Sequence, residues 1–341
     1  MFQILGGIIP FLSSELFVRS LRLRNRVVLP PMASELASPD GEVTNELLAY
    51  YALRSSCVGL VIVEHSYISP EGKYSYRQLG IWHDGLIEGL NKLSSTIKGG
   101  GAVAVIQLNH AGGRANPAVC GCRPIAPSSV PIPRGFDIPR EMISEDFERV
   151  LKSFKEAAVR AIRAGFDGVE IHGAHGYLLN QFLSPITNRR VDEFGGSLEG
   201  RMRFPLTVVE EVRKVLHGRL LMYRLGADDM LEGGFTVSEA VKVAVKLVEV
   251  GVDIIDVSGG LCGGTPPELQ GIQGFFIPLA EKIKKFVDVP VVGVGGIEDP
   301  CFANRIIAEG RVDLVAVGRA HLKNPQWCCE ALNNLHKCVD S

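Results

Sequence analysis

Two histidines and a tyrosine stand close together in the segment His172-Gly-Ala-His175-Gly-Tyr177. An imidazole pair can donate hydrogen bonds to a carbonyl oxygen and polarise an attached C=C bond, and a nearby phenol can then supply a proton. A metal site is the alternative, but H-x-x-H lacks the i, i+4 spacing of the zinc helix motif and no third ligand is evident. One histidine alone would more often be an ordinary hydrogen-bonding residue. Two histidines with a tyrosine favour chemistry on a carbonyl compound.

A second candidate site lies towards the C-terminus, where glycines end two apolar runs. Gly295 and Gly296 end the first run, and Gly318 and Arg319 end the second. Backbone N–H groups exposed by glycine, beside a cation, often bind phosphate after strands seven and eight of a barrel. A glycine-rich run alone often marks a turn, so the position of these residues carries the argument. The pattern predicts a phosphorylated ligand.

Two further polar residues allow two interpretations each. Arg224 ends an apolar run, where it needs a carboxylate partner or an electron-rich ligand. Strand alternation points Glu64 and Glu170 the same way, so a structural ion pair is as good an interpretation as ligand contact. Gln107 could satisfy polar groups of the core, although its amide also suits the edge of a flavin pyrimidine ring. The sequence leaves both pairs of alternatives open.

Eight short β-branched runs must position these residues, and a helical pattern follows each run, as in a parallel sheet. The expected strands are 26–30, 59–64, 102–109, 167–172, 220–225, 253–258, 290–294 and 313–318. The expected helices are 44–57, 84–98, 144–164, 199–216, 236–250, 277–287, 299–309 and 325–335. Helix start signals occur at Ser144, Thr236 and Asp299.

This alternation fits an open doubly wound sheet or a closed barrel. The polar residues at or just past the strand ends are spread over the whole chain; they include His65, Gln107, His172, Arg224 and Ser258. A barrel brings all its strand ends to one mouth, where active sites of this architecture lie. We therefore predict a single (β/α)8 TIM-barrel domain over residues 1–341. Residues 1–22 form an N-terminal cap, and the Pro-, Gly- and Ser-rich stretch 110–143 crosses the barrel mouth.

Composition narrows the range of partners. Lys and Arg total 36 against 38 Asp and Glu without a long block of either sign, so no nucleic-acid partner is expected. No apolar stretch is long enough for a membrane span, and no basic residue precedes Arg19 as it would in a signal peptide. The expected partner is a small-molecule substrate, and a homo-oligomer is left open.

Eight cysteines occur at irregular spacings without a CxxC pair. Several lie in apolar segments, where buried thiols are common, and this favours a reducing cytoplasm as the location. Cys120 and Cys122 form a C-x-C pair with no second pair nearby, so a structural loop is preferred over a metal site. No metal is expected.

Five motifs resemble the old yellow enzyme family of FMN-dependent oxidoreductases over about residues 23–327. They are LRNRVVLPPMA (23–33), GLVIVEHSYISPEG (59–72), IQLNHAGGR (106–114), GVEIHGAHGYLLNQFLSPITNRRVDEFGGSLEGR (168–201) and VGRAHLKNP (317–325). The chain is similar to the short bacterial branch and to the barrel portion of 2-enoate and 2,4-dienoyl-CoA reductases. The fourth motif is long and highly specific.

The resemblance implies where the cofactor and the substrate bind. The residues implied at FMN are Pro30, Pro31, Met32, Ala33, His65, Gln107, Arg224, Gly295, Gly296, Gly318 and Arg319. His172 and His175 would bind the substrate carbonyl, and Tyr177 would protonate the carbon α to it. Flavin would deliver hydride to the β carbon. The implied activity is an NAD(P)H-dependent ene-reductase acting on α,β-unsaturated carbonyl compounds.

The chain departs from the family pattern at two positions. Ala33 stands where relatives often carry Cys or Thr, and Glu35 stands on the substrate side where a tyrosine is common. Cys328, Cys329 and Cys338 lack the spacing of an iron–sulfur cluster. We therefore expect FMN as the only redox centre, reduced by transient NADPH or NADH, and no iron–sulfur cluster. Reduction of nitro compounds or quinones at the same site and a non-catalytic flavin-binding role are the alternatives.

Overall fold

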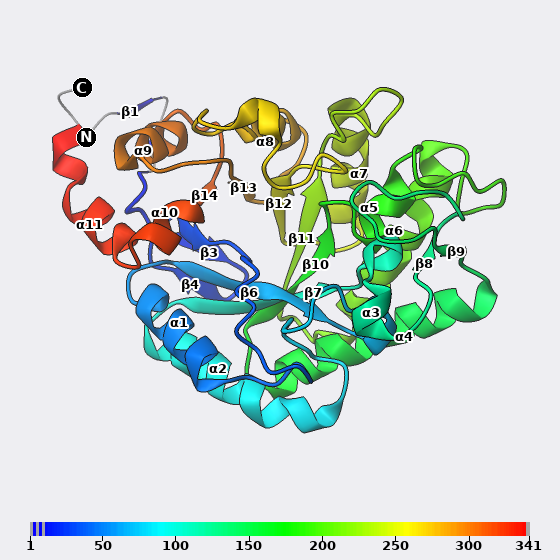
Figure 1. Cartoon of the computed structure of the whole chain (residues 1–341). Helices are drawn as coiled ribbons and strands as arrows, with labels where there is room; N and C mark the ends of the chain where they lie inside the picture. The colour runs from blue at the N-terminus through cyan, green and yellow to red at the C-terminus, as the bar shows by residue number, and fades with distance from the viewer. Residues whose placement is uncertain (1–2, 5–6, 9–10, 339–341) are drawn as a thin grey trace.

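The computed structural model describes residues 3–4, 7–8 and 11–338 of the chain (Figure 1). Its centre is a closed barrel of eight parallel strands, each within a few residues of a predicted run. In barrel order these are β5 (Val27–Leu29), β6 (Leu60–Tyr67), β7 (Val103–Asn109), β10 (Gly168–Gly173), β11 (Leu220–Gly226), β12 (Ile254–Ser258), β13 (Val291–Gly293) and β14 (Leu314–Ala316). The predicted (β/α)8 barrel is confirmed.

Alternate residues of these strands fill the barrel. Because side chains on a strand point alternately inward and outward, one set packs in the interior and the other against the helices. The interior cluster includes Val28, Leu60, Val105 and Met222, all fully buried. This packing explains why the strands read as continuous apolar runs.

Helices lie around the outside of the barrel (Figure 1). They are α1 (Asn45–Ser55), α2 (Ile87–Gly99), α4 (Ser144–Arg163), α6 (Leu198–Val215), α7 (Val237–Glu249), α8 (Ile277–Lys284), α9 (Pro300–Ala308) and α11 (Trp327–Asn333). The start signals at Thr236 and Asp299 are confirmed as N-caps. Helix α4 begins at Ser144 as expected, although the N-cap is Ile143, whose N–H donates to Asp146 Oδ2 at 2.9 Å.

Several short elements escaped the sequence analysis because they span too few residues to show a period. The helices are α3 (Pro117–Cys120), α5 (Leu178–Leu183) and α10 (Arg319–Lys323), and the two-stranded pairs are β1 (Gln3–Ile4) with β2 (Gly7–Ile8), β3 (Leu16–Val18) with β4 (Leu21–Leu23), and β8 (Ile125–Ala126) with β9 (Arg140–Glu141). Val18 and Leu23 join the interior cluster, so the hairpin β3–β4 packs against the barrel interior, and the cap over residues 1–22 stays a prediction. Positions 1–2, 5–6 and 9–10 of that cap lie outside the described residues.

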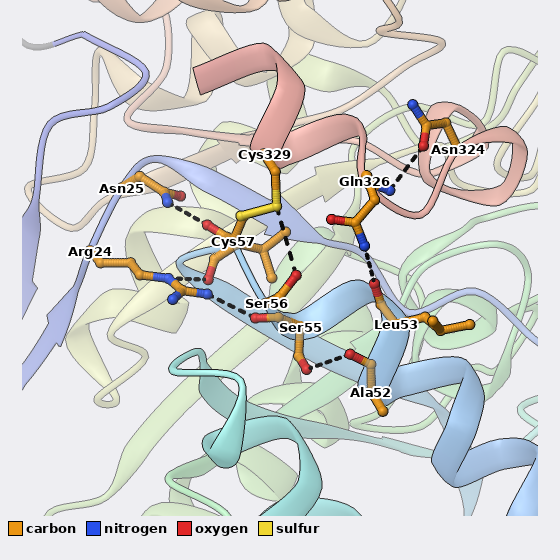
Figure 2. Close-up of a disulfide and its surroundings, with 11 residues drawn as sticks. Arg24, Asn25, Ala52, Leu53, Ser55, Ser56, Cys57, Asn324, Gln326 and Cys329 are labelled. Carbon is orange, nitrogen blue, oxygen red and sulfur yellow. Dashed lines mark hydrogen bonds between the residues drawn. A yellow bond between two sulfur atoms is a disulfide. The ribbon is translucent and has the colours of Figure 1, made fainter. Parts of the chain in front are cut away.

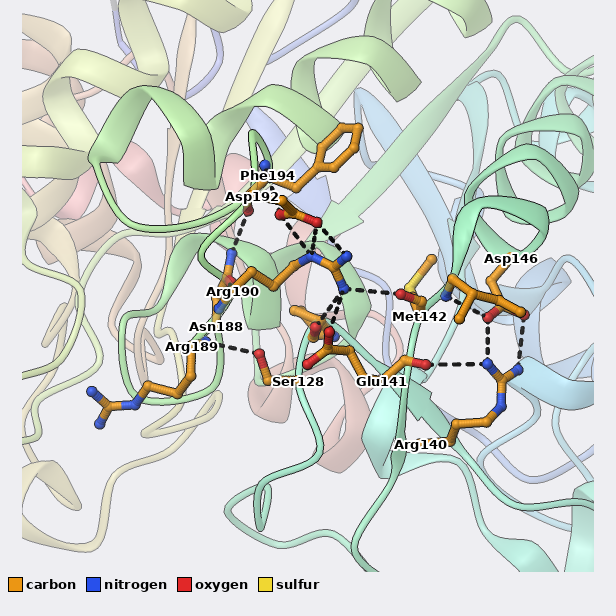
Figure 3. A network of polar contacts seen from close by, with 12 residues as sticks. Ser128, Arg140, Glu141, Met142, Asp146, Asn188, Arg189, Arg190, Asp192 and Phe194 are labelled. Carbon is orange, nitrogen blue, oxygen red and sulfur yellow. Dashed lines mark hydrogen bonds and ion pairs between the residues drawn. The ribbon is translucent and has the colours of Figure 1, made fainter.

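Charged contacts fasten the 110–143 excursion to the barrel (Figure 3). Arg140 binds both carboxylate oxygens of Asp146, at 2.5 and 2.8 Å. Arg190 donates through Nη1 to the carbonyl oxygens of Pro127 and Met142, both at 2.9 Å. Bidentate arginine contacts of this kind hold a loop in a defined geometry. The excursion therefore has a fixed base on helix α4 and on the segment after α5.

The sequence analysis expected free thiols, but the structure contains two disulfides. Cys57 is bonded to Cys329, as Figure 2 shows, and Cys301 is bonded to Cys338. The partners are 272 and 37 residues apart, so no local spacing could reveal the pairs. Since disulfides are rare in most cytosolic proteins, the cysteines no longer favour a reducing cytoplasm. The free cysteines of the described residues are Cys120, Cys122, Cys262 and Cys328.

No helix within the described part of the chain is both long enough and apolar enough to cross a membrane.

Candidate active site

The predicted histidines and tyrosine meet at the carboxyl ends of the barrel strands. The His172 ring centroid lies 5.1 Å from that of His175 and 5.0 Å from that of Tyr177. His172 is near the end of β10, and Tyr177 caps the start of α5. His175 lies between them with φ of 58°, a conformation that non-glycine residues adopt rarely and usually near functional sites. The turn after β10 thus aims all three side chains into one space.

Hydrogen bonds hold His175 in this conformation. Its backbone N–H donates to Gly259 O at 3.1 Å, and its Nε2 lies 2.7 Å from Ser258 Oγ. Burial lowers the pKa of His172 and of His175 well below the usual range, and nearby positive charges act in the same direction. Both imidazoles are therefore neutral at physiological pH, each with one N–H to donate.

Tyr177 keeps its proton over a wide pH range. Burial raises the pKa of its phenol to about 12, although Arg114 acts in the opposite direction. His65 stacks on the Tyr177 ring with centroids 5.4 Å apart. Gln78 Nε2 lies 2.9 Å from His65 Nδ1, and burial lowers the pKa of His65 to about 4. His65 is thus an uncharged ring that packs against Tyr177.

A buried network surrounds Arg224. Its Nε lies 3.1 Å from Asp256 Oδ2, and the two residues pair in register on β11 and β12. This ion pair replaces the partners Glu64 and Glu170 that strand alternation suggested. The sequence analysis did not single out Asp256, although it lies directly opposite Arg224 on the next strand. Arg224 also lines the glycine cavity described below, so the ion-pair interpretation is confirmed and the ligand contact stays a prediction.

Gln107, Glu170 and Glu64 are all held by hydrogen bonds within the protein. Gln107 Nε2 donates to Glu170 Oε1 at 2.7 Å, which is the core interpretation of this amide. Burial and the neighbouring Asp256 raise the pKa of Glu170 well above the usual range. Glu64 accepts a hydrogen bond from Ser34 Oγ at 2.9 Å, and burial raises the pKa of Glu64 to about 7.

A cavity of about 170 Å³ lies between the ends of β5, β13 and β14. Its lining includes the predicted cofactor residues Pro30, Pro31, Met32, Arg224, Gly295, Gly296, Gly318 and Arg319, together with His175. His65, Gln107 and the exposed Ala33 are not among the lining residues.

The cavity suits a phosphate group. Gly295 has φ of 129°, and a Cβ there would lie 2.8 Å from the backbone nitrogens of Phe275 and Phe276. A Cβ on Gly296 would lie 2.8 Å from Arg319 Nη2. Within the described ranges Arg319 makes no ion pair with an acidic side chain. Glycine backbone and a free guanidinium therefore face one hollow, as the phosphate of FMN requires.

Glu35 is held by the loop that contains Ser75 and Arg77. It has φ of 56° and accepts hydrogen bonds from Ser75 Oγ at 2.5 Å and from the Arg77 N–H at 3.3 Å. Its carboxylate is thus held by the 75–77 loop, and the predicted substrate contact stays a prediction. No group of three or more metal-ligating side chains occurs among the residues that the structure describes.

The sequence analysis missed two arginines at the mouth. The guanidinium carbon of Arg114 lies 4.9 Å from the Tyr177 ring centroid and 5.1 Å from that of Tyr74. Arg134 reaches the same mouth from the excursion and donates to Leu261 O. Arg114 ends the motif IQLNHAGGR, which was the available signal, whereas nothing near Arg134 marked it.

Known proteins resemble the chain over most of its length. The profile of the NADH:flavin oxidoreductase / NADH oxidase family matches residues 15–337. An NADH oxidase of Thermoanaerobacter brockii is 42% identical over 341 residues, covering 97% of this chain and 52% of that protein. An NADPH dehydrogenase of Geobacillus sp. (strain WCH70) is 40% identical over 332 residues, covering 97% of this chain and 96% of that protein. The chain thus spans about half the length of the first relative and nearly all of the second.

Solved structures agree with these relatives. Morphinone reductase has a TM-score of 0.86 at 28% identity, covering 96% of this chain and 91% of that one. A 2-naphthoyl-CoA reductase complex has a TM-score of 0.90 at 26% identity, covering 96% of this chain and 53% of that one. The barrel, the glycine cavity and the match of nearly the whole chain lead to one conclusion. The chain belongs to the NADH:flavin oxidoreductase / NADH oxidase family, which includes the old yellow enzymes and uses FMN with NADH or NADPH as the reductant.

Proposed function

We propose that the chain reduces the C=C bond of α,β-unsaturated carbonyl compounds, with NADH or NADPH as the electron source. The observation that supports this most directly is the neutral His172 and His175 pair facing the Tyr177 phenol beside the glycine cavity. Two N–H donors suit a carbonyl oxygen, and a retained phenol proton suits the carbon next to it.

Residues of the glycine cavity would hold FMN, which supplies hydride transfer when it is bound. Gly295, Gly296 and Arg319 would bind its phosphate through backbone N–H groups and a guanidinium. Arg224 would face the electron-rich side of the ring, and Asp256 Oδ2, 3.1 Å from its Nε, balances part of its charge. Pro30, Pro31 and Met32 would cover the ring edge.

The histidines and the tyrosine have distinct roles in this proposal. His172 and His175 donate hydrogen bonds to the substrate carbonyl oxygen and stabilise the negative charge that develops there. Because both rings are neutral, the oxygen stays unprotonated and the proton goes to carbon. Tyr177 Oη supplies that proton to the α carbon. His65 and Arg114 pack against the Tyr177 ring and hold the ring in place.

The first test is anaerobic mixing of the purified holoenzyme with NADPH or NADH, followed by 2-cyclohexenone, while the flavin absorbance is recorded. We expect bleaching by the nicotinamide and recovery on addition of the enone. Bleaching without recovery by the enone would contradict the proposal.

Nitro compounds and quinones are the second candidate substrates, because the same N–H donors fit their oxygen atoms. Recovery with p-benzoquinone or a nitroarene, but not with the enone, would favour this class. A protein that binds flavin but is never bleached by either nicotinamide would instead be a non-catalytic flavin-binding protein.

A further inference from the structure

Arg114 is a buried cation at the reaction site. Only 6% of its surface is exposed, and its Nε has no hydrogen-bond partner in the described structure. Its other nitrogens contact the His175 carbonyl oxygen and, at 3.4 Å, Tyr74 Oη. These partners are neutral oxygens, so the contacts leave the positive charge uncompensated. An uncompensated buried charge is costly unless a ligand supplies the opposite charge.

Arg134 brings a second cation to the same mouth. It has φ of 61° and donates to the Leu261 carbonyl oxygen. A Cβ added to Gly264, in the adjoining loop, would lie 3.3 Å from His175 Nε2, so this loop packs closely on the carbonyl-binding histidine. Burial lowers the pKa of Arg134, and the positive charge of Arg114 acts in the same direction. A Cβ added to Gly176 would lie 3.4 Å from both Arg114 Cδ and Leu261 Cδ2, and Arg134 donates to the carbonyl oxygen of the same Leu261. The two arginines therefore reach one short stretch of the mouth from opposite sides of Leu261.

Acidic side chains do not neutralise this pair. Of the residues that the structure describes, none with a carboxylate lies within ion-pair distance of Arg114 or Arg134. Glu268 lines the same cavity as Arg134 but forms no ion pair with it. Glu35, across the mouth, already accepts hydrogen bonds from Ser75 and Arg77. The positive charge is thus available to a ligand.

The space beside Arg134 is large and mainly apolar. A cavity of about 370 Å³ is lined by Arg134 together with apolar side chains that include Pro133, Met230, Leu231, Leu261 and Pro266. Its volume is in the range of small-ligand pockets. A hydrocarbon segment would bury apolar area there while its polar end meets the arginine.

We propose that Arg114 and Arg134 form an anion subsite that selects activated alkenes carrying a second, anionic group, such as a carboxylate or phosphate. The inference rests on the proposed function, and it names the substrate class of that same site. The carbonyl of such a substrate binds His172 and His175, and the anionic end binds the two guanidiniums. An uncharged enone contacts only His172 and His175 and leaves the two guanidiniums without a ligand.

The phosphates of the nicotinamide nucleotide are the competing source of anionic charge. Oxidation and reduction of the flavin are separate half-reactions, so stopped-flow measurements of each one distinguish the two ligands. An effect on flavin reoxidation by the alkene supports the proposal. An effect confined to flavin reduction by NADPH or NADH assigns the arginines to the reductant and overturns it.

The test compares 4-carboxycinnamaldehyde with its neutral 4-carbamoyl analogue, which have nearly the same shape. The holoenzyme variant is Arg134→Gln. The matched control is Arg123→Gln, because Arg123 is also on the excursion and also donates to backbone carbonyls, at 3.2 and 3.3 Å, but it does so at Ile138 and Pro139. We expect the wild-type second-order rate constant of reoxidation to favour the carboxylate. Arg134→Gln should lower that preference about tenfold, as for loss of a charged hydrogen bond of about 1.4 kcal/mol.

Binding gives a readout that does not require turnover. The dissociation constants of 4-carboxybenzaldehyde and 4-carbamoylbenzaldehyde, which have no reducible C=C bond, follow from perturbation of the flavin spectrum. We expect the carboxylate to bind more tightly, and added salt or Arg134→Gln to reduce its advantage. Equal binding of the two aldehydes, or an equal loss for both in Arg134→Gln, would overturn the anion subsite. If neither cinnamaldehyde reoxidises the flavin but the carboxylate still binds more tightly, the result would contradict the proposed function and not the anion subsite.

Discussion

Burial sets the protonation state of each residue at the reaction site. His172, His175 and His65 all have pKa values below the usual histidine range because of desolvation, whereas desolvation raises the pKa of Tyr177 to about 12. The same physical cause thus produces neutral donors for an oxygen and a neutral acid for a carbon. None of these groups should titrate near neutral pH.

Tyr177→Phe removes the phenol but keeps the ring that packs on His65. We expect flavin reduction by NADPH to continue and reoxidation by 2-cyclohexenone to slow by about 10² or more, the usual contribution of a general acid. In the wild type the reoxidation rate should stay flat from about pH 6 to pH 9, because the phenol pKa is about 12. Stopped-flow absorbance measures both half-reactions. Unchanged reoxidation in the variant would remove Tyr177 from the proton transfer.

The raised pKa of Glu64 predicts how the free energy of unfolding changes with pH. Its pKa in the fold is raised to about 7, so between the unfolded value and pH 7 the native state holds a proton that the unfolded state lacks. Stability contributed by the neutral carboxyl is therefore present at low pH and is lost as pH rises through that window, by roughly 3 kcal/mol. Glu64→Gln should not show this loss. Urea unfolding of both proteins at several pH values gives the comparison, and parallel stability curves would contradict the raised pKa.

At the scale of elements, glycines that follow the short strands β13 and β14 shape the glycine cavity. Gly296→Ala should weaken FMN binding about tenfold or more, because its Cβ would displace Arg319 Nη2, 2.8 Å away, from the phosphate position. Reconstitution of the apoprotein, followed by quenching of flavin fluorescence, measures the dissociation constant.

Gly310→Ala is the matched control for this change. Gly310 has φ of 69°, close to the 62° of Gly296, but a Cβ there meets nothing within 4 Å. Both variants should lose about 1 kcal/mol of stability from backbone strain. Only Gly296→Ala should lose FMN affinity, and an equal loss in both would show that strain, not the contact with Arg319, is responsible.

At the scale of the whole molecule, one of the two disulfides links segments that are far apart in the sequence. Cys57 follows α1 and Cys329 is in α11, 272 positions further along the chain (Figure 2). A cross-link that closes so long a loop restricts the unfolded state strongly, and its removal typically costs about 2 to 5 kcal/mol. Cys57→Ser with Cys329→Ser should therefore lower the melting temperature by several degrees, whereas Cys120→Ser with Cys122→Ser, at free cysteines, should change it little.

Thiol titration in denaturant tests the same pairing. We expect reaction of the free cysteines Cys120, Cys122, Cys262 and Cys328 before reduction and of all eight cysteines after it. Eight reactive thiols in the untreated protein would show that the pairs are reduced in solution.

Local patterns in the sequence predicted the barrel and its eight strands, because apolar runs alternate with helical segments. They also pointed to His172, His175 and Tyr177 as one cluster and to Gly295, Gly296 and Gly318 after the last strands, whereas Pro30, Pro31 and Met32 were implied by the family resemblance. The contacts of Arg224 with Asp256, of Gln107 with Glu170 and of Cys57 with Cys329 became visible only in the folded chain. The same holds for Arg114 and Arg134, which both approach Leu261 at the mouth beside Tyr177. The physical reason is that these contacts join residues on different strands and loops, and their distances are set by barrel closure, which no local spacing records.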